Sequence, residues 1–301
     1  MCCTSFKIAV QKIFNRPAKI DPAIGNEQLG LSAVIKEYGF ISEPSTEKTD
    51  ESNQDAFYRG DDSHGQLTYA VADGVSQSPD ARNWAQRLVG ISPLVLSHKD
   101  SFVSEFFKMQ SAYLEDWEGR KNIILENNKN NWRFNFGNRS TINTPSGATY
   151  CSVTFHKTDE GLQYHALAIG DSCLFHISDG KLHNFFPLEK IEDFSRPPCV
   201  AYAGISKESL VDPTIGLQTC SGSVKEGDFI ILATDAIAKW IYAQYSSPDS
   251  EVKNFRELLM LAKANDVDGM RAYISKERMN ATLQDDDTTL LILRVNDGNA
   301  Q

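Results

Sequence analysis

Runs of apolar residues that alternate with polar ones predict strands along much of the chain. QLTYAVADG (66–74) alternates its apolar side chains and then turns polar, which is typical of a strand that ends in a turn. ATYCSVTFHK, LQYHALAIG and CLFHIS, within 148–178, predict three more strands. The short joints between them, TDEG and Asp171-Ser172, predict two hairpins. Further strands are predicted at 34–41, 229–235 and 288–295.

Apolar residues at three- and four-residue steps predict helices in two blocks. Ser78-Pro79-Asp80 offers a cap, a proline for the first turn and an acidic group, which favours a helix start. A second helix begins near Asp100 and carries an aromatic stripe at 102–117, which we interpret as core packing rather than a partner site. The second block lies at about 250–278. Strands linked by hairpins, with helices in separate blocks, predict an α+β protein with antiparallel sheets.

In three segments the apolar residues follow neither the spacing of a helix nor that of a strand. Residues 1–32 are interpreted as an N-terminal extension, and 181–225 is irregular and rich in Pro and Gly. Residues 120–146 predict an exposed insertion loop. This segment is locally basic, and a solvated loop is favoured over a partner contact.

Composition narrows the function classes. The chain has 301 residues, 41% of them hydrophobic, and a formal net charge of −10, which supports a folded core and disfavours nucleic-acid binding. No apolar run approaches the roughly 20 residues of a membrane helix, and no signal peptide is recognisable. The six cysteines form no C-x-x-C pair, so a cytoplasmic location without membrane contact is expected.

The candidate chemistry lies in aspartates at strand ends. Asp73 and Asp235 end predicted strands, Asp171 lies between two of them, Asp55 precedes a short apolar run, and 285–287 precedes the last strand. Carboxylates that meet at one point repel unless a cation neutralises them, and all-oxygen ligation selects Mg²⁺ or Mn²⁺. For any single position, a turn-forming aspartate is the more economical interpretation.

The segments NQDAFY, VADGVS, SGATYCSV, AIGDSCLF, LATDAIAKW and DDDTTLLIL, in this order, closely resemble the motifs of the type 2C metal-dependent serine/threonine protein phosphatases (the PPM family). The resemblance covers about 33–295 and points to a bacterial-style member, because the D-G pair is not followed by H-G-G. It implies an α-β-β-α sandwich over 33–297, with two antiparallel sheets packed face to face and flanked by helices. It also implies that 181–225 is a flap-like segment beside the active site.

The resemblance implies a role for each matching residue. Asp73 would bridge two divalent ions, Mn²⁺ or Mg²⁺, and the carbonyl of Gly74 would complete one coordination sphere. Asp235 and Asp286 would ligate the ions from other strands, and Asp55 would hold bound waters. Asp171 matches the position that supports a third, weaker ion, and Thr289 would help to hold the last loop. Asp55, Asp73, Asp235 and Asp286 would form the catalytic set.

The chain also departs from the family pattern. The arginine that binds substrate phosphate is replaced by Asp50, and the acidic residue before Asp55 is Gln54. Lys48, Arg59 and Arg82 are weak candidates to replace the arginine, and a solvated surface role is favoured for each.

The resemblance implies hydrolysis of phosphoserine or phosphothreonine in proteins by a metal-activated water, which would reverse a cognate serine/threonine kinase. One alternative is a pseudophosphatase that acts as a binding module, which the loss of the arginine favours and the retained aspartates oppose. Another is an enzyme that acts on a different phosphoester, such as a nucleotide.

Overall fold

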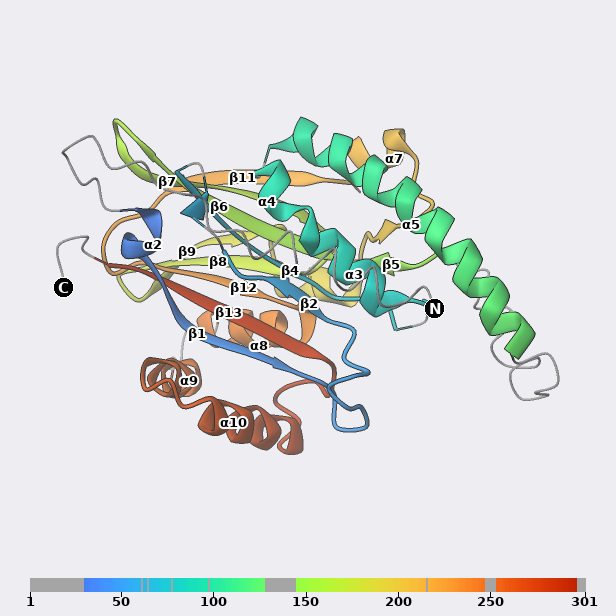
Figure 1. The fold of residues 1–301 in the computed structure, drawn as a ribbon. Helices are drawn as coiled ribbons and strands as arrows, with labels where there is room; N and C mark the ends of the chain where they lie inside the picture. Colours follow the sequence, from blue (N-terminus) through green and yellow to red (C-terminus); the bar gives the residue numbers. More distant parts are fainter. Residues whose placement is uncertain are drawn as a thin grey trace, which may run out of the picture.

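The computed structural model describes residues 30–60, 62–63, 65–76, 78–96, 98–127, 145–214, 216–246 and 253–296. Its framework is two antiparallel sheets that pack face to face (Figure 1). The first sheet has the order β1 (Ile35–Glu43), β13 (Thr288–Val295), β12 (Phe229–Ala233), β8 (Cys173–Ser178) and β9 (Lys181–Phe186). The second has the order β11 (Gln218–Ser223), β7 (Gly161–Ile169), β6 (Tyr150–Thr158), β4 (Gln66–Ala72) and β2 (Ala56–Tyr58), with β3 (Asp62–Ser63) paired to β4.

Helices cover the outer face of each sheet (Figure 1). The second sheet carries α3 (Ala81–Gly90), α4 (Ser92–Val95) and α5 (Lys99–Asn127). The first carries α8 (Asp235–Ser246), α9 (Lys253–Lys263) and α10 (Val267–Met279). Shorter elements are α2 (Leu31–Val34), β5 (Gly147–Ala148) paired with β10 (Ala201–Tyr202), the 3₁₀ turn η2 (Ile191–Ser195) and α7 (Lys207–Val211). The predicted α-β-β-α sandwich is therefore confirmed.

Strand alternation divides the core into three layers. In β4, Leu67, Tyr69 and Val71 point into the layer between the sheets, while Ala70 and Ala72 face α3. The outer layer on the second sheet is built around Trp84, which is fully buried and donates to the carbonyl of Ala201 at 2.6 Å. The aromatic stripe of α5 packs in this layer, as predicted.

The predicted hairpin at Asp171-Ser172 is wrong. β7 pairs with β6 and β11 in the second sheet, whereas β8 pairs with β12 and β9 in the first. The two-residue joint therefore crosses between the sheets, and Asp171 and Ser172 are both buried instead of lying at a solvent-exposed turn. Gly170 makes this possible, with φ of +93° and a backbone so close to the carbonyl of Cys199 that a Cβ would lie 2.6 Å from it.

Other helices and strands also differ from the elements that the sequence predicts. Residues 120–127 of the expected insertion loop form the last turns of α5, and 128–144 lie outside the described residues. The irregular segment 181–225 begins with β9 and ends with β11, which are edge strands of the two sheets. The helix α8 was not predicted, because its apolar residues follow β12 without a break.

The first described residues already belong to the packed structure. Leu31 in α2 is buried in the layer between the sheets, and 1–29 lie outside the described residues. The division into an extension and a domain stays a prediction. Among the described helices, none has the length and apolar character needed to cross a bilayer.

Candidate active site

One end of the sandwich gathers the predicted carboxylates. Strand pairing places Asp55 before β2, Asp73 after β4 and Asp171 after β7 at the same end of the second sheet. Asp235 follows β12 and Asp286 precedes β13 at the facing end of the first sheet. The pKa of Asp73 is raised well above its ordinary value by burial first, and then by the charges of Asp55, Asp235, Asp171 and Asp286. The charges of the other four predicted aspartates therefore act on Asp73 from the same end of the sandwich.

Asp55 is buried, and only one of its two carboxylate oxygens accepts a hydrogen bond. Its Oδ2 accepts a hydrogen bond from the Thr234 hydroxyl at 3.0 Å, whereas its Oδ1 is buried without a partner. Its pKa is raised to about 7, first by burial and then by the negative charges of Asp287 and Asp235, against hydrogen bonds from Thr289 and Thr234 that lower it. This carboxyl has one oxygen to offer to a ligand.

Asp73 and Gly74 form a tightly held turn. The carbonyl of Asp73 accepts from the amide of Thr149 at 2.8 Å, and its amide donates to the Thr149 hydroxyl at 3.3 Å. A Cβ at Gly74 would lie 2.8 Å from the Gln54 carbonyl oxygen and 2.9 Å from that of Ala81. Only glycine fits there, so the turn carries Asp73 close to the loop that holds Asp55.

Asp171 and Asp235 complete the buried part of the cluster. Burial raises the pKa of Asp171 to about 7, with a contribution from the charge of Asp235, and its Oδ1 is buried without a partner. Burial and the charge of Asp286 raise the pKa of Asp235 to about 6, while Lys239 and the amide of Ala236 favour the charged form.

The three consecutive aspartates before β13 have different roles. Asp287 is buried and accepts from the Lys48 ammonium at 2.8 Å, the Gln54 amide at 2.7 Å and the Ser45 amide at 3.0 Å. Asp285 is exposed and accepts from the Thr46 amide at 2.9 Å. Asp286 is left to face the cluster, with its Oδ1 accepting from the next amide at 2.8 Å.

Buried threonines support the cluster, and they were mostly missed by sequence reasoning. The Thr234 hydroxyl accepts from the Thr289 amide at 2.9 Å while it donates to Asp55. Thr149 joins the Asp73 turn to Ser172 through a hydroxyl contact of 2.6 Å. Of these threonines only Thr289 was expected, from its spacing after the last aspartate in the resemblance; no signal in the sequence singled out Thr149 or Thr234.

The donor chemistry fits a hard divalent cation. Within the described residues, no group of three or more His, Cys, Asp or Glu side chains is already arranged to hold a metal ion. The cluster nevertheless consists of carboxylates, with unpartnered buried oxygens on Asp55 and Asp171. Without a cation these like charges repel and raise one another's pKa. Divalent ions with oxygen ligands would give each of these orphan atoms a partner.

The three candidate cations lie in different surroundings. Lys48 is held by Asp287 and by the Gln54 side chain at 3.0 Å. Arg59 pairs with Glu37 and lies over the ring of Phe40, 4.9 Å from its centroid. Arg82 donates from Nη1 to the backbone carbonyl of Asp50 at 2.5 Å.

Arg82 also shares a cavity with the cluster. This cavity has a volume of about 380 Å³ and lies where the edge strands β1 and β2 meet α3. Its described lining is Phe40, Ser42, Asp50, Asn53, Asp55, Ala56, Phe57, Arg82 and Gln86. Arg82 is the only cationic side chain in this described lining, and its guanidinium bonds to the carbonyl of Asp50, the residue at which the resemblance expects an arginine.

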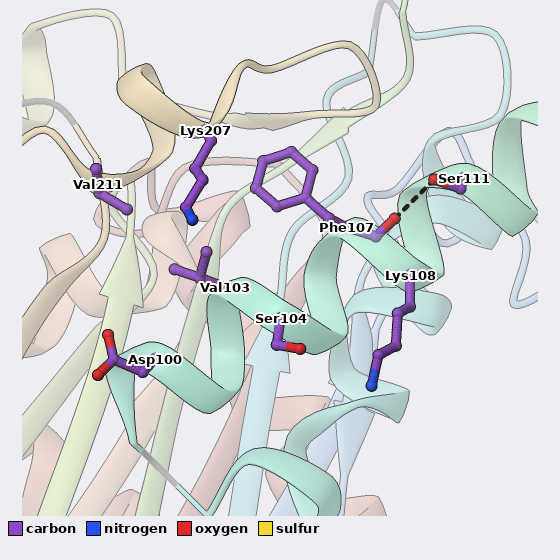
Figure 2. A pocket seen from close by; sticks show the side chains of 8 residues that line it. All are labelled: Asp100, Val103, Ser104, Phe107, Lys108, Ser111, Lys207 and Val211. Atoms are coloured by element: carbon purple, nitrogen blue, oxygen red, sulfur yellow. Dashed lines mark hydrogen bonds between the residues drawn. The ribbon is translucent and has the colours of Figure 1, made fainter.

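A wider groove lies away from the carboxylates, between α5 and α7. It has a volume of about 1110 Å³, and Figure 2 shows Phe107 and Val103 on α5 facing Lys207 and Val211 on the opposite side. None of the five clustered aspartates is among its described lining residues. We therefore do not assign the phosphatase chemistry to this groove.

The comparisons with known proteins identify the family and agree with the fold. The family model for protein phosphatase 2C matches residues 44–284. The chain belongs to the protein phosphatase 2C family. No curated protein matches the chain.

Solved structures of bacterial phosphatases share the type 2C fold of this chain. The catalytic domain of the serine/threonine phosphatase PstP, solved with two manganese ions, is 14% identical with a TM-score of 0.53, over 88% of this chain and 99% of that one. The PstP/Ppp phosphatase of Mycobacterium tuberculosis is 15% identical with a TM-score of 0.51, over 88% and 100%. PppA, a regulatory component of T6SS in Pseudomonas aeruginosa, is 14% identical with a TM-score of 0.51, over 87% and 98%.

Proposed function

We propose that this protein hydrolyses phosphoserine and phosphothreonine in proteins by a metal-dependent reaction, and so reverses a serine/threonine kinase. The observation that carries the proposal is the convergence of five aspartates at one end of the sandwich, with orphaned buried oxygens on two of them. Family membership supports the reaction class. The two manganese ions in the similar PstP domain support a binuclear site.

Asp73, Asp235 and Asp286 would hold two Mn²⁺ or Mg²⁺ ions, with the Gly74 carbonyl and Asp55 completing the set, and Asp171 would serve a third. When bound, such ions lower the pKa of a water molecule and neutralise the charge of a phosphoryl group. Thr234 orients one oxygen of Asp55 and leaves the other free. The close packing at Gly74 keeps Asp73 near Asp55.

Arg82 is proposed to bind the substrate phosphate. A phosphate monoester is a dianion, and a guanidinium can give it two parallel hydrogen bonds. Arg82 lines the cavity that also contains Asp55, whereas Lys48 and Arg59 are engaged by carboxylates. These contacts favour Arg82 among the three candidates.

The alternative is a binding module without turnover. Asp50 and Gln54 favour it, because they replace groups that the family uses at the site. The aspartate cluster favours the enzyme: Asp55, Asp73, Asp171 and Asp235 have raised pKa values because they are buried and repel one another, which costs stability, and a binding surface does not require them.

The experiment is hydrolysis of p-nitrophenyl phosphate and of a phosphothreonine peptide with Mn²⁺, with Mg²⁺ and with EDTA. Asp73→Asn is expected to lower the metal-dependent rate by at least about a hundredfold, since it removes the central carboxylate. Asp159→Asn, in the exposed β6–β7 turn, is the matched control and should keep the full rate. Metal-dependent turnover that survives in Asp73→Asn would contradict the assignment.

A further inference from the structure

The loop between β1 and β2 presents an acidic surface beside the proposed active site. Glu47, Asp50 and Glu51 are exposed, and within the described residues none of them forms an ion pair. The one cation of this loop, Lys48, bonds inward to the buried Asp287 and the Gln54 side chain. The loop therefore shows negative charge to an approaching substrate.

The cavity of about 380 Å³ adjoins this acidic surface and is large enough for a side chain of a ligand. Asp50 lines it together with Phe40 and Phe57, whose ring centroids lie 4.4 Å apart. Phe57 is 41% exposed, which is unusual for a large apolar side chain. Asp55, which is 94% buried and has an unpartnered Oδ1, lines the same cavity. The cavity thus joins an acidic group, an aromatic surface and the proposed reaction centre.

We propose that this cavity binds the side chain of a lysine or arginine next to the phosphorylated residue of the substrate, so that the protein prefers phosphoserine and phosphothreonine in basic sequences. The inference rests on the proposed function, because it takes Asp55 as part of the reaction centre. The aliphatic stem of the basic residue packs on the exposed ring of Phe57, since Arg59 already lies over the ring of Phe40, and its charged head faces Asp50. Long cationic side chains are suited to such a site, since they bury their stems and keep the head solvated.

Charge complementarity selects this occupant. An acidic flanking residue would be repelled by Glu47, Asp50 and Glu51, and an apolar one would leave their charges unmatched. The bound phosphate dianion offsets the guanidinium charge of Arg82, which is bonded to the Asp50 carbonyl. Glu47, Asp50 and Glu51 then keep the surface negative, although the charge of Arg271 also acts on Asp50.

The test uses three phosphothreonine peptides that differ only in the residues flanking the phosphothreonine, which are lysine, alanine or glutamate. Both kcat/KM with Mn²⁺ and the Kd in EDTA, by fluorescence anisotropy, are measured. The lysine peptide is expected to be favoured over the alanine peptide by about three- to fivefold, as for an exposed ion pair, with a smaller ratio at high salt. Asp50→Asn should bring the ratio close to one, while Glu226→Gln, an exposed carboxylate in a different cavity, should leave it unchanged.

Equal treatment of the three peptides by the wild type would overturn the inference, as would a full lysine preference in Asp50→Asn. Hydrolysis of p-nitrophenyl phosphate is measured in parallel. If p-nitrophenyl phosphate is not hydrolysed but the lysine peptide still has the lowest Kd, the proposed function alone is refuted. If hydrolysis is normal but the three peptides bind and react equally, the inference alone is refuted.

Discussion

At the scale of single residues, the number of hydrogen bonds that a buried carboxylate accepts distinguishes a structural aspartate from a candidate metal ligand. Asp287 is buried, but an ammonium and two amides satisfy it, so it holds the loop that carries Gln54. Asp55 and Asp171 are buried just as deeply and keep an oxygen with no donor. A carboxylate that is buried and unsatisfied costs stability unless a ligand completes it.

Arg82→Gln is expected to lower kcat/KM for p-nitrophenyl phosphate by about ten- to a hundredfold, mainly through KM, because a charged hydrogen bond to the phosphate is lost. Arg59→Gln removes a guanidinium that pairs with Glu37 and serves as the matched control, with little change expected. The double variant Asp50→Arg/Arg82→Gln should recover part of the loss. It places a guanidinium on residue 50, whose carbonyl the Arg82 guanidinium contacts.

Calorimetry with Mn²⁺ on Arg82→Gln separates phosphate binding from a scaffolding role. Unchanged Mn²⁺ affinity together with a raised KM is the expected result. Loss of Mn²⁺ affinity would mean that Arg82 acts by holding the loop at Asp50, and the phosphate-binding proposal for this residue would then be wrong.

At the scale of elements, the site depends on two features that join the sheets and helices. The crossover from β7 to β8 carries Asp171 from one sheet to the other through Gly170. The helix α3 begins at Ala81, whose carbonyl packs against Gly74, and is anchored by Trp84, whose ring packs edge-on against Tyr113 and Phe106 of α5. Packing in these elements therefore sets the position of Asp73 and Arg82.

Trp84→Ala is expected to lower the free energy of unfolding by about 3–5 kcal/mol, because it removes a fully buried indole and the bond to the Ala201 carbonyl. Leu94→Ala, at a position that is 63% exposed, should change it by less than about 0.5 kcal/mol. Urea unfolding monitored by far-UV circular dichroism measures both values. A loss below about 1 kcal/mol in Trp84→Ala would show that this layer contributes little to stability.

At the scale of the whole molecule, the carboxylate cluster couples folding to pH and to metal ions. The pKa of Asp171 is raised from 3.8 to about 7, and that of Asp55 behaves in the same way. Between these two pH values the folded protein binds more protons at the cluster than the unfolded chain does. The contribution of these groups to the free energy of unfolding is therefore present below pH 3.8 and is lost as the pH rises to about 7.

Asp171→Asn, which removes one of these charges, is expected to gain stability relative to the metal-free wild type as the pH rises from about 4 to about 7. Mn²⁺ should stabilise the wild type most at the upper end of this range, because the carboxylates are then ionised and a ligand that binds only the folded state stabilises it. Thermal unfolding at several pH values, with and without Mn²⁺, measures both effects. A constant difference between variant and wild type across this range would contradict the raised pKa.

The sequence predicted most of the strands and the chemical character of the site. The apolar run 288–295 coincides with β13, because a strand buried on both faces requires a continuous apolar stretch. The helix α8 and the β7–β8 crossover were missed, since a short apolar run or a two-residue joint is compatible with more than one structure. The partner of a strand depends on residues far away in the chain.

The sequence by itself determined the apolar pattern that makes two sheets and the position of aspartates at strand ends, because both depend on the order of neighbouring residues. Only the tertiary structure decided that Asp287 is satisfied by Lys48 while Asp286 faces the cluster, and that Arg82 lies beside the Asp50 carbonyl. These contacts join residues that are more than 30 positions apart. The packing of one sheet on the other creates them, and no local pattern of residues encodes it.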